Sequence, residues 1–106
     1  GNARAADLQF ALYHLRDAER KTGLYRDTLV PKARQSLEVA RQGFEAGRVS
    51  FLTLVDAERA LLEFQLALAR ARAEQGKRLA EIEMLVGRPL PAATAKGRPN
   101  GDVSDE

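Results

Sequence analysis

Phe44-Glu-Ala-Gly-Arg-Val-Ser-Phe-Leu-Thr-Leu-Val-Asp-Ala57 separates two long segments that both have the apolar period of an α-helix. The first segment runs from about residue 4 to 45 and the second from about residue 51 to 86. The sequence therefore predicts an all-α fold. We expect a long antiparallel two-helix coiled-coil hairpin over residues 3–87, with its turn at residues 46–50.

The turn contains residues that commonly end one helix and begin another. Gly47 can adopt the left-handed conformation that follows many helices. Ser50 can cap the next helix by accepting a hydrogen bond from a backbone N–H about three residues on. Phe44 and Phe51 flank the turn, so we expect their rings to close over each other. The sequence predicts a short, tightly capped turn.

The first arm has one apolar stripe with a helical period. Its members run from position 8 to position 44 in ten intervals, a mean of 3.6 residues. Pro31 removes a backbone donor, which predicts either a bend in a continuous helix or a true helix boundary near residues 28–30. Gly43 weakens a helix by about 1 kcal/mol relative to Ala. The stripe consists of Leu8, Leu12, Leu15, Ala18, Thr22, Tyr25, Leu29, Ala33, Leu37, Ala40 and Phe44.

The second arm is apolar on two sides. The first arm can cover only one of them, so the second stripe predicts that further helices pack alongside. The alternative is that its alanines merely raise helix propensity. One stripe consists of Leu54, Ala57, Leu61, Phe64, Leu68 and Ala71, and the other of Val55, Leu62, Leu66, Ala69, Ala73 and Ala80.

Composition and charge exclude several classes of protein. With 106 residues the chain is at most one domain, and a lone hairpin buries little apolar surface, so we expect a partner. The 17 basic and 15 acidic residues are interleaved and give a net charge of +2, which does not indicate nucleic-acid binding. No run approaches the roughly 18 apolar residues of a membrane-spanning helix. The Gly1-Asn-Ala-Arg4 start lacks the pattern of a signal peptide.

Residues 88–106 have no apolar period and contain three of the four prolines. A segment of this composition cannot bury enough apolar surface to offset the entropy of ordering it. We expect a flexible, disordered C-terminal tail there and assign it no function.

The sequence does not predict an enzyme. His14 has no second histidine or cysteine with which to build a metal site. Glu81 and Glu83 lie two positions apart and point in different directions from a helix, so they do not form an acid and base pair. No nucleophile lies in a plausible triad, and no glycine-rich phosphate loop is present. We therefore expect no catalytic residues, no metal and no cofactor.

Asp56 is the polar residue that stands out beside the apolar seam of the second arm. A buried, unpaired carboxylate would be costly there. One interpretation is an exposed first-turn acid that favours the positive end of the helix. The other is a polar group directed at a lumen or a partner.

Several segments together resemble the outer-membrane efflux proteins of the TolC family, over residues from about 5 to 90. Two stretches are also similar to the branch of that family that serves heavy-metal cation efflux, namely Arg26-Asp-Thr-Leu-Val-Pro31 and Phe51-Leu-Thr-Leu-Val-Asp56. The segments that carry the family resemblance are Leu29-Val-Pro-Lys-Ala33, Ser36-Leu-Glu-Val-Ala40, Gly43-Phe-Glu-Ala-Gly47, Ser50-Phe-Leu-Thr-Leu-Val-Asp-Ala-Glu-Arg59, Leu61-Leu62 and Gln65.

The resemblance implies a trimeric channel with a β-barrel in the outer membrane of a Gram-negative bacterium and an α-helical tunnel through the periplasm. This chain would be the second periplasmic hairpin of each subunit. Its turn would form the pore tip, where a periplasmic adaptor protein docks and links the channel to an inner-membrane pump. The residues implied at this tip are Phe44, Gly47, Arg48, Val49, Ser50, Phe51 and Asp56. Phe44 replaces the usual tyrosine, and Val49 replaces a polar or basic residue of other members.

Helical periodicity alone also fits a protein of another class. A soluble coiled-coil scaffold or protein-interaction module could use the second apolar stripe to dimerise into a four-helix bundle. In both cases we expect the isolated hairpin to self-associate and to bind no nucleic acid.

Overall fold

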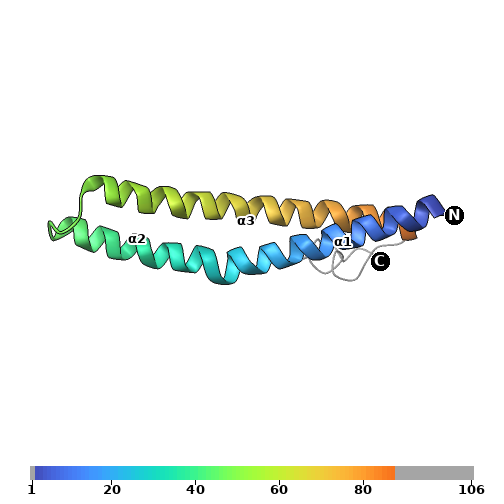
Figure 1. The fold of residues 1–106 in the computed structure, drawn as a ribbon, viewed down its shortest axis with the longest axis horizontal. Helices are drawn as coiled ribbons and strands as arrows, with labels where there is room; N and C mark the ends of the chain where they lie inside the picture. Colours follow the sequence, from blue (N-terminus) through green and yellow to red (C-terminus); the bar gives the residue numbers. More distant parts are fainter. Residues whose placement is uncertain (1, 88–106) are drawn as a thin grey trace, which may run out of the picture. The chain divides into compact units, whose positions relative to one another are not determined.

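A computed structural model describes residues 2–87, and the predicted all-α hairpin is confirmed over this part of the chain (Figure 1). The first arm consists of helix α1 (Asn2–Leu24), a π-helical turn η1 (Tyr25–Leu29) and helix α2 (Val30–Glu45). The second arm is helix α3 (Phe51–Val86). No strand occurs between residues 2 and 87. The tail predicted for residues 88–106 lies outside the described residues.

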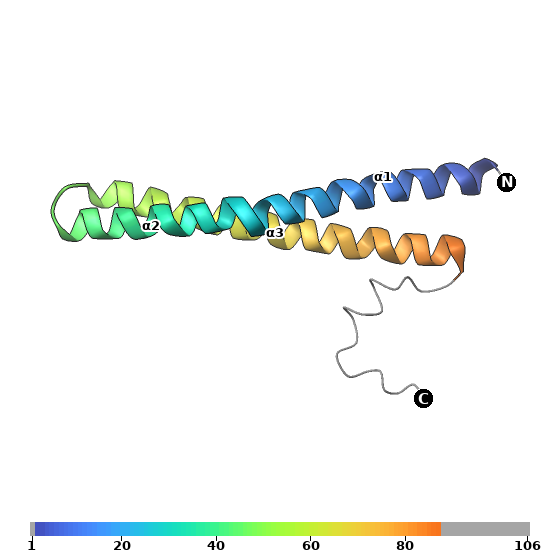
Figure 2. The same ribbon diagram turned by 90° about the horizontal axis from the view of Figure 1, so that it is seen from below.

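The chain divides into two compact units. The turn unit comprises residues 19–72, and the terminal unit combines residues 2–18 with residues 73–87 of the described part. In the turn unit, α2 and α3 run antiparallel on either side of the turn (Figure 2). In the terminal unit, the start of α1 packs against the end of α3.

Small and branched apolar side chains fill the seam of the terminal unit. Ala11, Leu15, Leu79 and Ile82 are buried together, and Ile82 is only 3% exposed. The partly buried side chains that pack against this cluster are Leu8, Leu12 and Leu85. The first-arm stripe thus faces α3 in this unit.

The buried side chains in the seam of the turn unit are small. Val30, Ala33, Ala40 and Ala71 are its buried apolar residues. The Tyr25 and Phe64 rings meet across it, with centroids 6.1 Å apart. Small side chains allow two helices to approach closely but bury little area. Among the described residues no large side chain is less than 2% exposed.

A π-helical turn precedes Pro31 and carries the first arm past it without a break. Leu29 and Val30 both have right-handed helical dihedrals, and the Val30 N–H donates to the carbonyl of Tyr25, five residues earlier. In an ordinary α-helix the proline ring would clash with the carbonyl four residues before it. The wider π-turn relieves this clash. Of the two outcomes expected at Pro31, the structure has the continuous helical path.

Thr22 lies one turn before the π-turn and is buried in the seam at 5% exposure. Its Oγ1 atom has no hydrogen-bond partner within the described structure. A buried hydroxyl without a partner costs free energy, because it has lost its hydrogen bonds to water. The helical period of the first arm places Thr22 in the apolar stripe. It does not predict that the Thr22 hydroxyl lacks a hydrogen-bond partner.

Candidate functional site

The backbone of the turn forms a Schellman motif centred on Gly47. The φ angle of Gly47 is 75°, in the left-handed region. The Arg48 N–H donates to the Gly43 carbonyl at 2.7 Å, and the Gly47 N–H donates to the Phe44 carbonyl at 3.0 Å. These bonds satisfy two carbonyls that the end of α2 would otherwise leave unpaired. The left-handed glycine expected from the sequence is present at this position.

Ser50 caps α3 as its position predicts. Its Oγ accepts a hydrogen bond from the Thr53 N–H at 3.1 Å and lies 3.2 Å from the Thr53 hydroxyl. The Ser50 carbonyl also accepts from the Leu54 N–H at 3.3 Å. The turn is therefore fixed at both ends by hydrogen bonds, and its side chains have defined directions.

Val49 packs back onto Gly43, which sequence reasoning missed. Gly43 is buried, and a Cβ atom added to it would lie 3.2 and 3.3 Å from the two Val49 methyl carbons. Val49 is half-buried as a result. Its side chain closes the turn from inside, so it contributes more to the structure of the turn than to its surface. The sequence signal for this contact was Gly43, one helical turn before Gly47, together with the β-branched Val49 shortly after Gly47.

Apolar side chains dominate the surface of the turn and the start of α3. The Phe44 and Phe51 rings are 5.6 Å apart at 58°, so they close over each other as expected. Phe44 is 40% exposed and Phe51 62%. Leu52 is 67% exposed beside them, and sequence reasoning missed it because it belongs to neither stripe. We call Phe44, Phe51 and Leu52 the apex surface.

Charged residues of the candidate tip lie at the surface. Arg48 and Asp56 are both exposed. No acidic residue lies in the first turn of α3, and Asp56 follows in the second. Exposure of Asp56 is compatible both with a solvent-facing acid and with a group directed at a lumen or a partner. Because Asp56 lies beyond the first turn, the benefit of a first-turn charge does not apply.

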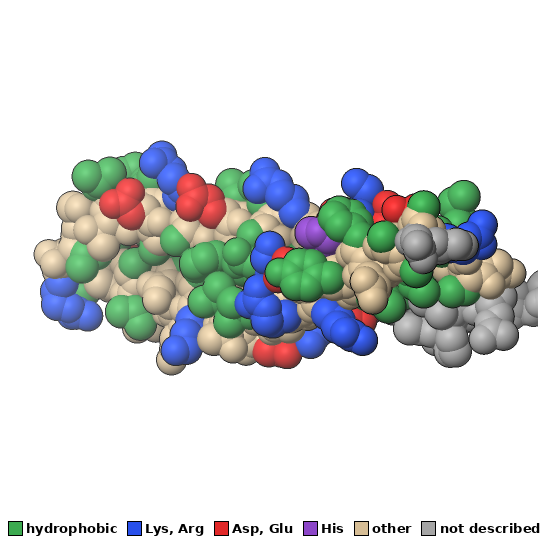
Figure 3. All heavy atoms as spheres, turned by 45° about the vertical axis from the view of Figure 1, so that its right-hand side comes forward, with side chains coloured by type: hydrophobic (Ala, Val, Ile, Leu, Met, Phe, Trp, Pro, Cys, Tyr) green, Lys and Arg blue, Asp and Glu red, His purple; other side chains and the backbone are tan. Residues whose placement is uncertain are grey.

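Most of the second apolar stripe of α3 is exposed, whereas its first member, Val55, is half-buried. Leu62 is 55% exposed and Leu66 45%, and the alanines that continue the stripe are exposed. On the face of the molecule drawn in Figure 3, hydrophobic side chains lie at the surface among charged ones. Phe51 precedes them, and Met84, which is 82% exposed, follows them. Phe51, Leu62, Ala73 and Met84 each lie 11 residues apart, which is close to three helical turns. We call this the outer face of α3: Phe51, Leu62, Leu66, Ala69, Ala73, Ala80 and Met84.

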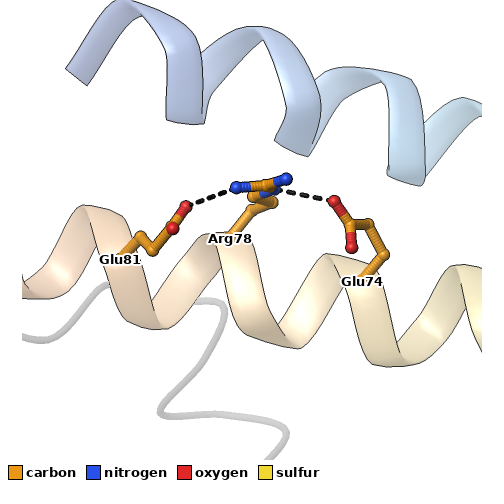
Figure 4. A network of polar contacts seen from close by, with 3 residues as sticks. All are labelled: Glu74, Arg78 and Glu81. Atoms are coloured by element: carbon orange, nitrogen blue, oxygen red, sulfur yellow. Dashed lines mark hydrogen bonds and ion pairs between the residues drawn. The ribbon is translucent and has the colours of Figure 1, made fainter. Parts of the chain in front are cut away.

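Arg78 joins two carboxylates along α3 in the terminal unit (Figure 4). Its Nε lies 2.7 Å from Glu74 Oε2 and its Nη1 lies 2.9 Å from Glu81 Oε1. The hydrogen bond from Arg78 holds the pKa of Glu74 below its usual value. The bonds to Glu81 and Glu74 raise the pKa of Arg78. Glu81 is an ion-pair partner of Arg78 in this network.

The Arg78 side chain is 12% exposed because it lies against α1. Its guanidinium carbon is 5.2 Å from the centroid of the Phe10 ring, a cation–π contact. The His14 ring stacks at 4.3 Å from Phe10 and 5.2 Å from Tyr13. His14 is thus an aromatic neighbour in the structure. Between residues 2 and 87, no three His, Cys, Asp or Glu side chains group in a way that could hold a metal ion.

Within the same range no helix is long and apolar enough to cross a membrane. Comparisons of the chain with protein-family models, with curated proteins and with solved structures found no match. The candidate surfaces are therefore the apex surface and the outer face of α3, and their geometry carries the functional argument.

Proposed function

We propose that this chain is a segment of the periplasmic α-helical tunnel of an outer-membrane channel subunit in a tripartite efflux pump. The channel would be a trimer, as the resemblance to the TolC family implies. The turn would be the periplasmic pore tip and would dock an adaptor protein that connects to an inner-membrane pump. The similarity to the heavy-metal cation branch assigns no substrate, because substrate choice would lie mainly in the inner-membrane pump.

The outer face of α3 is the observation that carries this proposal. A two-helix hairpin needs one apolar face on each helix, yet α3 has a second one along its length. Fully burying a leucine is worth about 1.5–3 kcal/mol relative to exposing it. Leu62 and Leu66 remain 55% and 45% exposed, so about half of that gain is still open to a neighbouring helix. A wall of adjacent hairpins would bury such a face.

The apex surface supports the docking role of the turn. The hydrogen bonds around Gly47 and Ser50 fix the turn before any partner binds. A surface that is already ordered avoids the entropic cost of ordering on association. Phe51 and Leu52 are exposed on it, and apolar side chains on a rigid turn suit a small contact with another protein.

A binding experiment with apex variants tests the docking role. The chain is immobilised and offered the helical hairpins of candidate periplasmic adaptors, as the parent sequence and as Phe51→Ser and Leu52→Ser. Val39→Ser is the matched control, because Val39 is 65% exposed but lies on α2 away from the apex surface. We expect at least a 10-fold loss of binding for the two apex variants and none for the control. Equal losses in all three, or an absence of binding to every adaptor, would contradict the proposed tip.

The second candidate function is a soluble coiled-coil scaffold, favoured by the same outer face of α3. It would bury this face in a four-helix bundle and would need no adaptor. The parent gene separates the two functions. A signal peptide and amphipathic strands of about 10 residues would support the channel, and a gene without either would support the scaffold.

A further inference from the structure

A groove that is open to solvent lies between α1 and α3 in the terminal unit. Its volume is about 370 Å³. Its lining residues fall between positions 7 and 11 and between positions 81 and 85, so the groove lies within one compact unit and spans about one turn of each helix. We call it the terminal groove. It is lined by Asp7, Phe10, Ala11, Glu81, Met84 and Leu85.

Large apolar side chains contribute to both walls of the terminal groove. Phe10 on α1 is 55% exposed and Met84 on α3 is 82% exposed, so both present apolar surface to water. The Phe10 ring is held between the His14 ring, at 4.3 Å, and the Arg78 guanidinium carbon, at 5.2 Å. The flexible thioether of methionine adapts to aromatic groups of different shape. A ligand that covers these two side chains is stabilised in proportion to the apolar area that it removes from water.

Both charged side chains that line the terminal groove are acidic. Asp7 is exposed, and its carboxylate has no ion-pair or hydrogen-bond partner among residues 2–87. Glu81 is directed toward α1 and binds Arg78 through Oε1 (Figure 4). Arg4 lies one turn before Asp7, but its guanidinium donates to the Leu85 carbonyl at 3.2 Å. The negative charge of Asp7 is therefore left for a ligand.

The dimensions of the terminal groove select the size of that ligand. The lining residues of each helix, five positions apart at most, span about 6 Å along its axis. An extended peptide advances about 3.3 Å per residue, so only about two of its residues would fit. Pockets for small molecules have volumes of about 300–1,000 Å³, and the terminal groove lies near the lower end of this range. Its size therefore favours a small molecule over a protein segment.

We propose that the terminal groove binds a small organic monocation with an aromatic or aliphatic body. The body covers Phe10 and Met84, and the positive charge lies beside Asp7 and Glu81. The net charge of the whole chain, +2, would instead attract anions, so a preference for cations has to come from these local acids. The inference goes beyond the proposed function, which concerns packing and docking of helices and assigns no small ligand.

Two ions of the same shape and opposite charge test this inference. Tetraphenylphosphonium is the cation and tetraphenylborate the anion. Each is titrated separately into the isotope-labelled full chain, and binding is followed by the chemical shifts of the backbone amides. An exposed charge pair contributes a few-fold to affinity, and two acids attract the cation and repel the anion, so we expect the cation to bind at least about 10-fold more tightly. The largest shifts should occur at residues 7–11 and 81–85. Equal binding of the two ions, tighter binding of the anion, or largest shifts elsewhere would overturn the inference.

Variants at exposed positions assign the binding to the terminal groove. Asp7→Asn removes the unpaired charge and Met84→Ser removes an apolar wall, and circular dichroism should show parent helical content in both. Asp56→Asn and Val39→Ser are matched controls, with the same kind of change at exposed residues of the turn unit. We expect each groove variant to weaken binding of the cation at least about 3-fold, and each control less than about 2-fold. Equal weakening by the controls would overturn the inference. Tighter binding of a short peptide of alternating leucine and lysine than of the cation would overturn it in favour of a protein segment.

Discussion

Gly43→Ala tests the packing of Val49 against the end of α2. Alanine in place of glycine should stabilise a helix interior by about 1 kcal/mol. At this position the new Cβ would lie 3.2 and 3.3 Å from the Val49 methyl carbons, closer than ordinary van der Waals contact. Inserting a methyl group into a packed site costs about 1–3 kcal/mol. With a cost near the middle of that range, we expect Gly43→Ala to lower the free energy of unfolding by about 1 kcal/mol.

A double-mutant cycle isolates the contact. In a Val49→Ala background the crowding methyls are absent, so the same Gly43→Ala change should raise the free energy of unfolding by about 1 kcal/mol. Gly76→Ala is the matched control, because an added Cβ meets nothing within 4 Å there and only the helix propensity changes. Unfolding is followed by circular dichroism in urea at one fixed, low protein concentration, since association would add to the apparent stability. Equal stabilisation by Gly43→Ala in both backgrounds would refute the packing of Val49 on Gly43.

Four further predictions concern single positions. Gly47→Val should lower the free energy of unfolding by at least about 1 kcal/mol, because valine is strained at φ 75°; an unchanged melting temperature would contradict the left-handed glycine. Ser50→Ala should cost about 1 kcal/mol in thermal melts through loss of the cap to Thr53, and Ser50→Asp should retain most of it. Thr22→Val should stabilise the chain by about 1 kcal/mol in urea unfolding, since it removes a buried hydroxyl without a partner; a loss would mean that the hydroxyl is satisfied. The pKa of Glu74 is lower in the folded chain than when unfolded, so its contribution to stability is present above the unfolded pKa and is lost as the pH falls through the folded one; Arg78→Met should flatten this part of the pH–stability profile.

Local chemistry made the caps of the turn predictable from the sequence. A glycine that can take a positive φ and a serine three residues before a backbone N–H act within a few positions, so the sequence determines them almost alone. Helical period likewise predicted the first-arm stripe, whose members at Leu15, Ala18, Ala33 and Ala40 are buried. The caps and the period of the stripe follow from residue spacing within one arm, so they can be predicted without knowledge of the partner helix.

Features that depend on three-dimensional contacts were not predictable in the same way. The packing of Val49 on Gly43 depends on the path of the chain after the helix has ended, and the sequence alone suggested only a weakened helix at Gly43. The π-turn solves a clash at Pro31 that could also have been solved by a break. Leu52 escaped notice because periodicity identifies stripes and does not register single apolar residues at an exposed turn.

The small size of the seam residues connects the fold to the proposed assembly. The buried apolar positions of the turn unit are three alanines and a valine, so the contact between its helices buries little area per turn. The outer face of α3 carries larger side chains, including Leu62 and Leu66, than most of the buried positions in that unit. Because hydrophobic stabilisation scales with the apolar area removed from water, covering Leu62 and Leu66 would add stability that the small seam residues do not provide. The exposed leucines of α3 thus leave apolar area that the seam between the two arms does not bury.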